Sequence, residues 1–232
     1  MDCMEGMKLF PDKFFDLAVV DPPYGIGEAN KNHASRNTPI KQKNGSTLKA
    51  PRTQYKRKAW DNNAPDQEYF NELRRVAKHL IIFGANHFID RFPFDKNASG
   101  WIIWDKVNGD NDFADVEMAW TDFDMGAKLV RYMWNGFMQG KSLKEGHLQQ
   151  GNKQLNEKRI HPTQKPVKLY EWIFANFTKP GQLILDTHLG SGSSRIAASK
   201  ANLKFVGFET DEDYFNSHQT RWNRFNSQIR LL

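Results

Sequence analysis

The sequence is poor in cysteine, with Cys3 alone among 232 residues. One thiol excludes an internal disulfide framework and any multi-cysteine metal site, and it agrees with a reducing compartment. The seven histidines are scattered without cysteine partners, so no metal site is expected. Long apolar runs are also missing, because none reaches the roughly 20 residues that span a bilayer, and the first residues lack a secretory signal pattern. These absences predict a soluble, cytoplasmic protein with no membrane partner.

Hydrophobic residues make up 39% of the chain, which is enough at this length for one sizeable core but not for two ordinary domains. We therefore expect a single domain over residues 1–232. The formal charge of +6 is concentrated in one segment, since nine basic residues and one acid between Glu28 and Lys58 give that segment +8 and leave about −2 elsewhere. Such a segment fits a polyanionic partner, although a solvated charged loop is the ordinary alternative.

Short apolar runs alternate with stretches of helical spacing along the chain. The runs predict strands at 17–20, 80–83, 101–104, 116–120, 129–134, 183–185 and 205–208. Helical spacing covers 67–78, 166–177, 193–202 and the end of the chain from residue 211 onward. This alternation predicts an α/β fold with an open, mostly parallel central sheet and helices on both faces.

Two stretches depart from this alternation. Residues 25–63 are polar, basic and interrupted by proline and glycine, and residues 135–160 also lack an apolar face for a core. Long loops without regular structure are usually functional or disordered. Both stretches are therefore candidates for substrate contact.

The first predicted strand ends in Asp21-Pro22-Pro23-Tyr24. The prolines prevent a helix start and fix an extended turn directly after the acid. Ligands of an open α/β sheet bind beyond the carboxyl ends of its strands, so Asp21 is a candidate site residue. A rigid strand exit in which Asp21 caps a turn is the structural alternative.

The strand at 183–185 leads through Asp186 into Thr187-His188-Leu189-Gly190-Ser191-Gly192-Ser193-Ser194 and then a helix. Glycines allow close approach of the backbone to a ligand, and the helix start offers free N–H groups. Glu209 ends the next strand, at about the spacing expected of a ribose-binding acid. The combination favours an adenosine-containing ligand, and a tight turn with a surface glutamate is the alternative.

Together these features resemble the β-class DNA amino-methyltransferases of bacteria and phages, in which an Asp-Pro-Pro-Tyr motif precedes the S-adenosylmethionine motif. The opening Asp2-Cys3, the strand end Trp104-Asp105-Lys106 and the hexapeptide from His161 to Pro166 carry the same resemblance. It implies a Rossmann-like methyltransferase fold with S-adenosylmethionine as cofactor, Asp2 near the adenine, and Thr163 and Lys165 at the methionine end. The implied cofactor-binding residues are Asp2, Cys3, Asp21, Thr163, Lys165, Asp186, His188, Gly190, Ser191, Gly192, Ser193 and Glu209.

The chain departs from the family at one place, because Thr187-His188 stands where the family commonly has Pro-Phe after the aspartate. The backbone role of the glycine-rich turn should survive this change, whereas packing beside the methionine portion is in doubt. His188 is either a cofactor neighbour or a hydrogen-bonded structural residue.

The resemblance implies methylation of the exocyclic amine of a flipped-out DNA base, with adenine N6 favoured over cytosine N4. Asp21 and the Pro22 carbonyl would accept hydrogen bonds from the amine, and Tyr24 would stack on the base, so Asp21, Pro22, Pro23 and Tyr24 form the catalytic set. Methylation of RNA or of a protein glutamine, and a nucleic-acid-binding homologue without catalysis, remain alternatives.

The implied partner is double-stranded DNA in a bacterial cell or a phage-infected host. Residues 135–160 would form a short target-recognition region, which leaves room for a homodimer in which a second subunit assists. Basic residues of the 25–63 segment would bind the phosphates. These are Lys31, Arg36, Lys41, Lys43, Arg52, Lys56, Arg57 and Lys58.

Overall fold

A computed structural model describes residues 1–27, 40–41, 47–48, 61–91, 99–108, 114–135 and 138–229. The helices are α1 (Cys3–Met7), α2 (Gln67–Val76), α3 (Val167–Phe177), α4 (Ser193–Lys200) and α5 (Glu212–Ile229), with short 3-10 turns η3 (Ala85–His87) and η4 (Lys153–Leu155). The strands of the main sheet are β1 (Phe15–Val20), β4 (Ala77–Phe83), β5 (Trp101–Asp105), β6 (Val116–Thr121), β7 (Lys128–Arg131), β10 (Leu183–Asp186) and β11 (Lys204–Gly207). Two small hairpins pair β2 (Ile40–Lys41) with β3 (Thr47–Leu48) and β8 (Trp134–Asn135) with β9 (Met138–Gln139).

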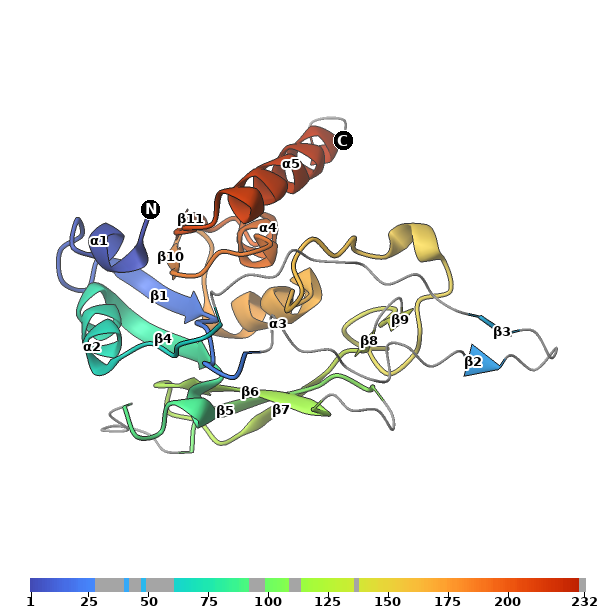
Figure 1. Cartoon of the computed structure of the whole chain (residues 1–232), viewed down its shortest axis with the longest axis horizontal. Coiled ribbons are helices and arrows are strands. Elements are labelled where there is room, and N and C mark those ends of the chain that lie inside the picture. The colour runs from blue at the N-terminus through green and yellow to red at the C-terminus, as the bar shows by residue number, and fades with distance from the viewer. Residues whose placement is uncertain are drawn as a thin grey trace.

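The main sheet has seven strands in the order β11-β10-β1-β4-β6-β5-β7 (Figure 1). Strand β6 runs antiparallel to both of its neighbours, and every other neighbouring pair is parallel. The mostly parallel sheet predicted from the sequence is therefore confirmed.

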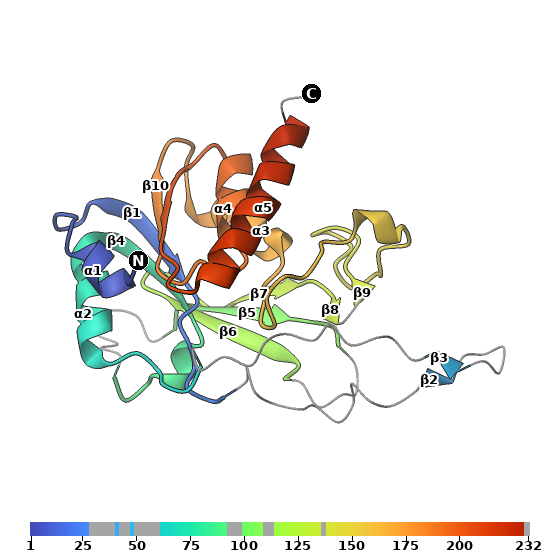
Figure 2. The same ribbon diagram turned by 45° about the horizontal axis from the view of Figure 1, so that its top comes forward.

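Helices cover both faces of this sheet (Figures 1 and 2). Alternation along β1 sends Leu17 and Val19 into a core with α3 and α4, whereas Ala18 and Val20 pack in a second core with α1 and α2. Since both faces of β1 are buried, the strand reads as a continuous apolar run rather than as an alternating one.

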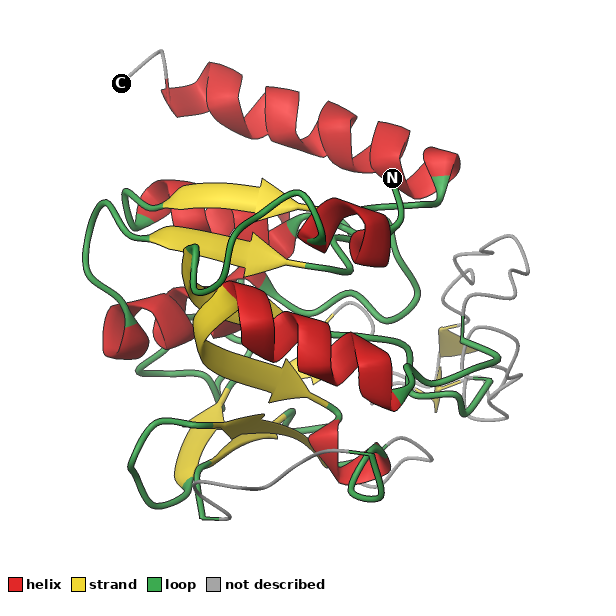
Figure 3. Cartoon of the chain, turned by 90° about the vertical axis from the view of Figure 1, so that its left-hand side faces the viewer, coloured by secondary structure: helices red, strands yellow, loops and turns green. Residues whose placement is uncertain are grey.

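The order in which successive strands are added to the sheet reverses between β1 and β10. From β1 the chain passes through α2 to β4, and from β10 it passes through α4 to β11, on the other side. Figure 3 shows these helices on opposite sides of the strands. Because Ala18 lies opposite Leu185, the loops after Val20 and after Asp186 open at the same edge of the sheet. A ligand site is expected in the crevice between them.

The described structure corrects three element boundaries. Helix α2 ends at Val76 rather than at Lys78, because the extended backbone of Ala77 begins β4 directly. The strand predicted at 129–134 is divided into β7 and β8. Helix α1 was not predicted, although Asp2 caps it by accepting from Met4 N at 2.8 Å. No helix among the described residues is long and apolar enough to cross a membrane.

Candidate active site

A cavity of about 260 Å³ lies where the loops after β1 and β10 meet the segment before α3. Eleven of the residues predicted for the site line it, although they come from five separate parts of the chain. They are Asp2, Cys3, Asp21, Pro23, Thr163, Lys165, His188, Gly190, Ser191, Ser193 and Glu209. Four other predicted residues, Pro22, Tyr24, Asp186 and Gly192, are absent from its lining.

Asp21 is the centre of a buried polar cluster beside the cavity. Its Oδ2 lies 2.5 Å from Lys165 Nζ, and its Oδ1 accepts a hydrogen bond of 2.9 Å from the Tyr24 hydroxyl. Lys165 Nζ also donates to the Tyr24 oxygen at 3.2 Å and pairs with Glu117 Oε2 at 3.1 Å. The ammonium group therefore contacts the aspartate, and because Lys165 also lines the cavity, its expected place at the methionine end of a cofactor stays a prediction.

Burial and charge oppose each other in this cluster. Burial raises the pKa of the Asp21 carboxyl, and the Lys165 charge only partly offsets that rise. Burial acts against the charged form of Lys165, but Asp21 and Glu117 outweigh it and raise the lysine pKa. Glu117 is half-buried, which by itself would raise its pKa, yet Lys165 and Lys106, the latter 3.3 Å away, lower that pKa. The cluster thus keeps Lys165 charged against two carboxyl groups.

Tyr24 is held in a fixed orientation by its surroundings. Its ring stacks on His87, with centroids 4.9 Å apart, and its backbone N donates to Asp61 Oδ1 at 2.9 Å. Gly84, which has a φ of +68°, leaves room for the tyrosine, because a Cβ there would lie 2.1 Å from the ring. Asp61 is only 2% exposed and also accepts from Gly25 N at 3.1 Å. The turn after Asp21 is therefore rigid.

The glycine-rich turn is closed by Glu209, whose Oε2 accepts from Gly190 N at 2.8 Å. Its Oε1 accepts from Asp211 N at 2.8 Å, so the carboxylate that was predicted to bind ribose also holds the cavity wall. Gly190 has a φ of +49°, a backbone conformation that favours glycine, although a Cβ there would meet nothing closer than His161 at 3.8 Å. Gly192 has a different role, because a Cβ there would lie 2.1 Å from His218 in α5.

Asp186 stands behind the turn rather than in the cavity. It is 2% exposed, and it accepts from His188 N at 3.1 Å and from Ser194 Oγ at 2.5 Å. Burial raises the pKa of this carboxyl to about 7, although both hydrogen bonds favour the ionised form. The side-chain contacts of Asp186 are with the turn that forms the cavity wall, and its role in cofactor binding stays a prediction.

This placement predicts a pH-dependent contribution to stability. Because the folded pKa of Asp186 lies above the ordinary value of 3.8, its contribution is fully present below about pH 4 and is lost as the pH rises through about 7. Asp186→Asn can keep both contacts but cannot ionise. We expect its free energy of unfolding, relative to the native protein, to rise by on the order of 2 kcal/mol between about pH 5 and pH 8. Urea unfolding at both pH values measures this difference, Asp12→Asn is an exposed control, and a pH-independent difference would contradict the assignment.

Thr187 and His188 form a buried chain with Tyr69. The Tyr69 hydroxyl lies 2.7 Å from Thr187 Oγ1, which lies 2.9 Å from His188 Nδ1. Burial lowers the pKa of His188 to about 4, so the imidazole is neutral at neutral pH. The unusual Thr187-His188 pair is therefore hydrogen-bonded to Tyr69 of α2. His188 borders the cavity and also has a structural partner in Thr187.

The other predicted residues are placed as follows. Asp2 caps α1 and lines the cavity beside Cys3, whose pKa is raised to about 11 by burial. Thr163 Oγ1 lies 3.1 Å from His161 Nδ1, and the His161 ring packs on Tyr214 with centroids 4.2 Å apart. No group of three or more metal-ligating side chains occurs among the described residues.

Of the eight predicted phosphate-binding residues, the structure describes Lys41 alone, as a residue of strand β2. The remaining seven lie outside the described residues, namely Lys31, Arg36, Lys43, Arg52, Lys56, Arg57 and Lys58.

Three residues of the site carried no signal in the sequence. Glu117 lies in an ordinary strand, Asp61 lies near the end of the 25–63 segment, and Tyr69 is one of the two aromatic residues of α2. For Glu117 the usable signal is an acid within an apolar run, because a charge in a partly buried strand needs a partner.

Comparison with known proteins identifies the class. The profile of the N6_N4_Mtase family, described as DNA methylase, matches residues 103–220. YubD of Escherichia coli (strain K12), a methylase by inference, is 25% identical over 95% of this chain and 87% of its own length. The type II methyltransferase M.HinfI of Haemophilus influenzae is 24% identical over 95% of this chain, which spans 66% of that protein.

Solved structures agree on the fold. The complex of M1.HpyAVI with S-adenosylmethionine has a TM-score of 0.54 at 17% identity, covering 96% of this chain and 97% of that one. The cytosine-N4-specific PvuII DNA methyltransferase has a TM-score of 0.54 at 15% identity, covering 96% and 84%. The fold is thus that of S-adenosylmethionine-dependent DNA methyltransferases. This chain belongs to the N6_N4_Mtase family of DNA methylases.

Proposed function

We propose that this protein transfers a methyl group from S-adenosylmethionine to the exocyclic amine of a base in double-stranded DNA, with adenine N6 as the preferred atom. One observation carries the proposal. Asp21, at the end of β1, and the glycine-rich turn after β10 border the same cavity. An acceptor for an amine and a turn suited to an adenosyl group thus meet in one place.

The chemistry of the cavity suits S-adenosylmethionine, which carries a sulfonium and an ammonium group against one carboxylate. Four acidic residues and a single lysine line the cavity, an excess of negative charge that favours a cationic ligand. The acids are Asp2, Asp21, Glu209 and Asp211. Gly190 and His161 both line the cavity, so the glycine-rich turn presents its backbone to a bound adenosyl group.

Asp21 would orient the target amine in this mechanism. S-adenosylmethionine supplies the methyl group, and the amine nitrogen must present its lone pair rather than share it with the ring. Hydrogen bonds from the amine to Asp21 and to the Pro22 carbonyl would hold that geometry, and the carboxylate would stabilise positive charge on nitrogen. Each oxygen of Asp21 already has one partner and retains a lone pair for another.

A base in a duplex must leave the stack to reach the cavity, at a cost of a few kcal/mol. Tyr24, fixed beside Asp21, is the side chain proposed to stack on it. Stacking of about 1–3 kcal/mol per base can offset part of the cost. Because His87 covers one face of the Tyr24 ring, the base would use the other face.

The basic segment is proposed to bind DNA phosphates. We expect simultaneous replacement of Lys56, Arg57 and Lys58 by glutamine to weaken DNA binding and to reduce the slope of log affinity against log salt by about 2–3, because fewer counterions are released. Titrations over a series of salt concentrations measure the slope. Glutamine at Lys168, Lys179 and Lys204, which removes equal charge elsewhere, is the matched control. An unchanged slope in the basic-segment variant would contradict phosphate binding by this segment and would favour the alternative of a solvated charged loop.

Labelled S-adenosylmethionine offered with separate DNA, RNA and protein pools tests the substrate class. Base-resolution mapping of DNA from cells that express the protein then separates N6-methyladenine from N4-methylcytosine and gives the sequence context. Label in RNA or protein alone would contradict the proposal, and N4-methylcytosine would correct the target atom.

A further inference from the structure

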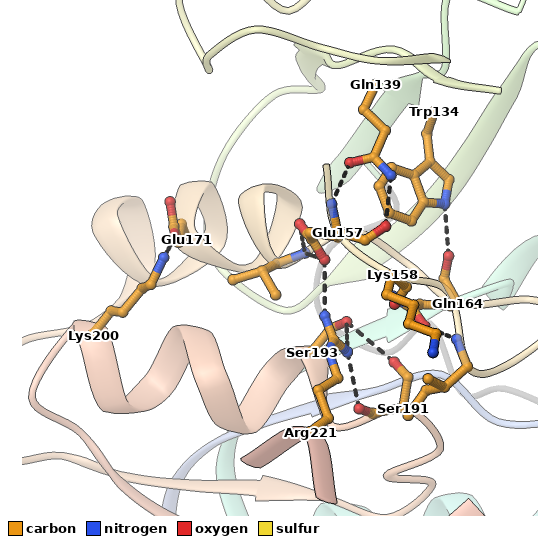
Figure 4. A network of polar contacts seen from close by, with 12 residues as sticks. Trp134, Gln139, Glu157, Lys158, Gln164, Glu171, Ser191, Ser193, Lys200 and Arg221 are labelled. Carbon is orange, nitrogen blue, oxygen red and sulfur yellow. Dashed lines mark hydrogen bonds and ion pairs between the residues drawn. The ribbon is translucent and has the colours of Figure 1, made fainter. Parts of the chain in front are cut away.

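Arg221, in the middle of α5, reaches two loops that border the cavity. Its Nη2 pairs with Glu157 Oε2 at 2.9 Å, and its Nη1 donates to the Ser191 carbonyl at 2.9 Å and to Ser193 Oγ at 3.0 Å. Figure 4 shows the guanidinium between the carboxylate and the two serines. One planar fork thus joins the glycine-rich turn to the segment before His161.

Glu157 is fixed by contacts on both sides. Its carboxylate accepts from Val167 N at 3.0 and 3.2 Å, and it supplies a cap for α3 that Pro166 lacks. Its backbone N and O are both held by the side-chain amide of Gln139, at 2.8 Å each (Figure 4). Gln139 is buried at the end of β9. Contacts therefore run from β9 through Glu157 and Arg221 to the cavity wall.

The contact with Ser191 controls the orientation of a peptide in that wall. Its carbonyl accepts from Arg221, while Gly192 N on the other side of the same peptide donates to the Leu189 carbonyl at 2.9 Å. Rotation of this peptide would break both hydrogen bonds. Ser191 and Ser193 both line the cavity, so Arg221 fixes the shape of the surface that a cofactor meets.

A contribution to folding stability is a poor explanation for the ion pair between Arg221 and Glu157. The Arg221 and Glu157 side chains are only 14% and 19% exposed, and a buried pair must recover the cost of its own desolvation. Such pairs are often no more stabilising than apolar side chains of similar size. Their distinct property is a fixed geometry, and here that geometry spans two loops with different proposed ligands.

We propose that Glu157 and Arg221 are positioning residues that couple residues 138–159 to the glycine-rich turn, so that DNA and the adenosyl cofactor strengthen each other's binding. The inference rests on the proposed function, in which the turn meets the cofactor, together with the expectation from the sequence that residues 135–160 form the target-recognition region for DNA. Either ligand orders both loops through this link, so the second ligand loses less conformational freedom on binding. The coupling is reciprocal by thermodynamic necessity.

Calorimetry tests the coupling. The Kd of S-adenosylhomocysteine, which is not consumed, is measured with the whole protein alone and with sheared, unmethylated phage λ DNA. We expect the DNA to tighten binding about tenfold in the native protein and less than about twofold in Arg221→Met and Glu157→Gln. Arg221→Lys keeps the charge but loses the fork, so its ratio should be intermediate.

Lys200→Met is the matched control, because it breaks a 2.7 Å pair with Glu171 between α4 and α3 without touching the turn, and its ratio should remain native. A native ratio near one, or an unchanged ratio in Arg221→Met, overturns the coupling. If Arg221→Met does not fold, an unchanged ratio in Arg221→Lys overturns the coupling. Methyl transfer by the native protein to the same DNA is followed in parallel. Its absence contradicts the proposed function, whereas activity with a ratio near one contradicts the coupling alone.

Discussion

Replacement of Asp21 by alanine is expected to lower methyl transfer to DNA by at least about 100- to 1000-fold while leaving S-adenosylmethionine affinity within about threefold of native. The expected loss is large because the variant removes an acceptor of the amine hydrogen bond and the charge nearest the reacting nitrogen. Cofactor affinity should persist because the glycine-rich turn is held by Glu209 and Arg221, neither of which contacts Asp21. Single-turnover transfer and calorimetry measure the two quantities separately.

Asp21→Asn divides the effect into shape and charge. Asparagine keeps one acceptor oxygen but cannot neutralise the charge of Lys165. If hydrogen-bond geometry contributes apart from charge, the Asp21→Asn variant should transfer methyl groups at a rate between those of Asp21→Ala and the native protein. Asp12→Ala is the matched control, since it removes an exposed carboxylate paired with Arg75 at 2.8 Å. Near-native turnover in Asp21→Ala would rule out the proposed role of Asp21.

Replacement of Lys165 by methionine is expected to slow methyl transfer about 10- to 100-fold at neutral pH and to move the acid limb of the pH–rate profile upward. Asp21 must be ionised to accept from the amine, so the rate rises with pH through the Asp21 pKa. Burial already raises that pKa, and Lys165 is the main opposing charge. Without the ammonium the pKa rises further, and each unit costs about tenfold in rate below it.

The profile distinguishes this electrostatic role from a structural one. Adding Glu117→Gln to Lys165→Met removes a carboxylate that also raises the Asp21 pKa, so the acid limb should move back toward native. Lys168→Met is the matched control, since it breaks a 2.7 Å pair with Glu171 on the outer side of α3. A rate that falls equally at every pH would assign Lys165 to packing or to the cofactor instead.

The sequence by itself determined the order of the elements and the identity of two site loops. Short β-rich runs alternate with helical spacing because the central strands are buried by helices on both faces, and this pattern located all seven strands of the main sheet, although β4 begins earlier than predicted and the run at 129–134 is divided. Asp21 and the turn at Gly190 were found because proline and glycine restrict the backbone locally, and a local restriction is visible in a local pattern.

Tertiary structure alone decided which groups touch. Lys165 is 144 positions from Asp21 in the chain, and no local pattern indicates that its ammonium lies on that carboxylate. Glu117, Asp61 and Arg221 joined the site for the same reason, because an ion pair or hydrogen bond depends on distance in space. The chain therefore specified which chemistry is present, and the parallel pairing of β1 with β10, whose carboxyl ends lie side by side, specified which charges share a low-dielectric cavity and shift one another's pKa.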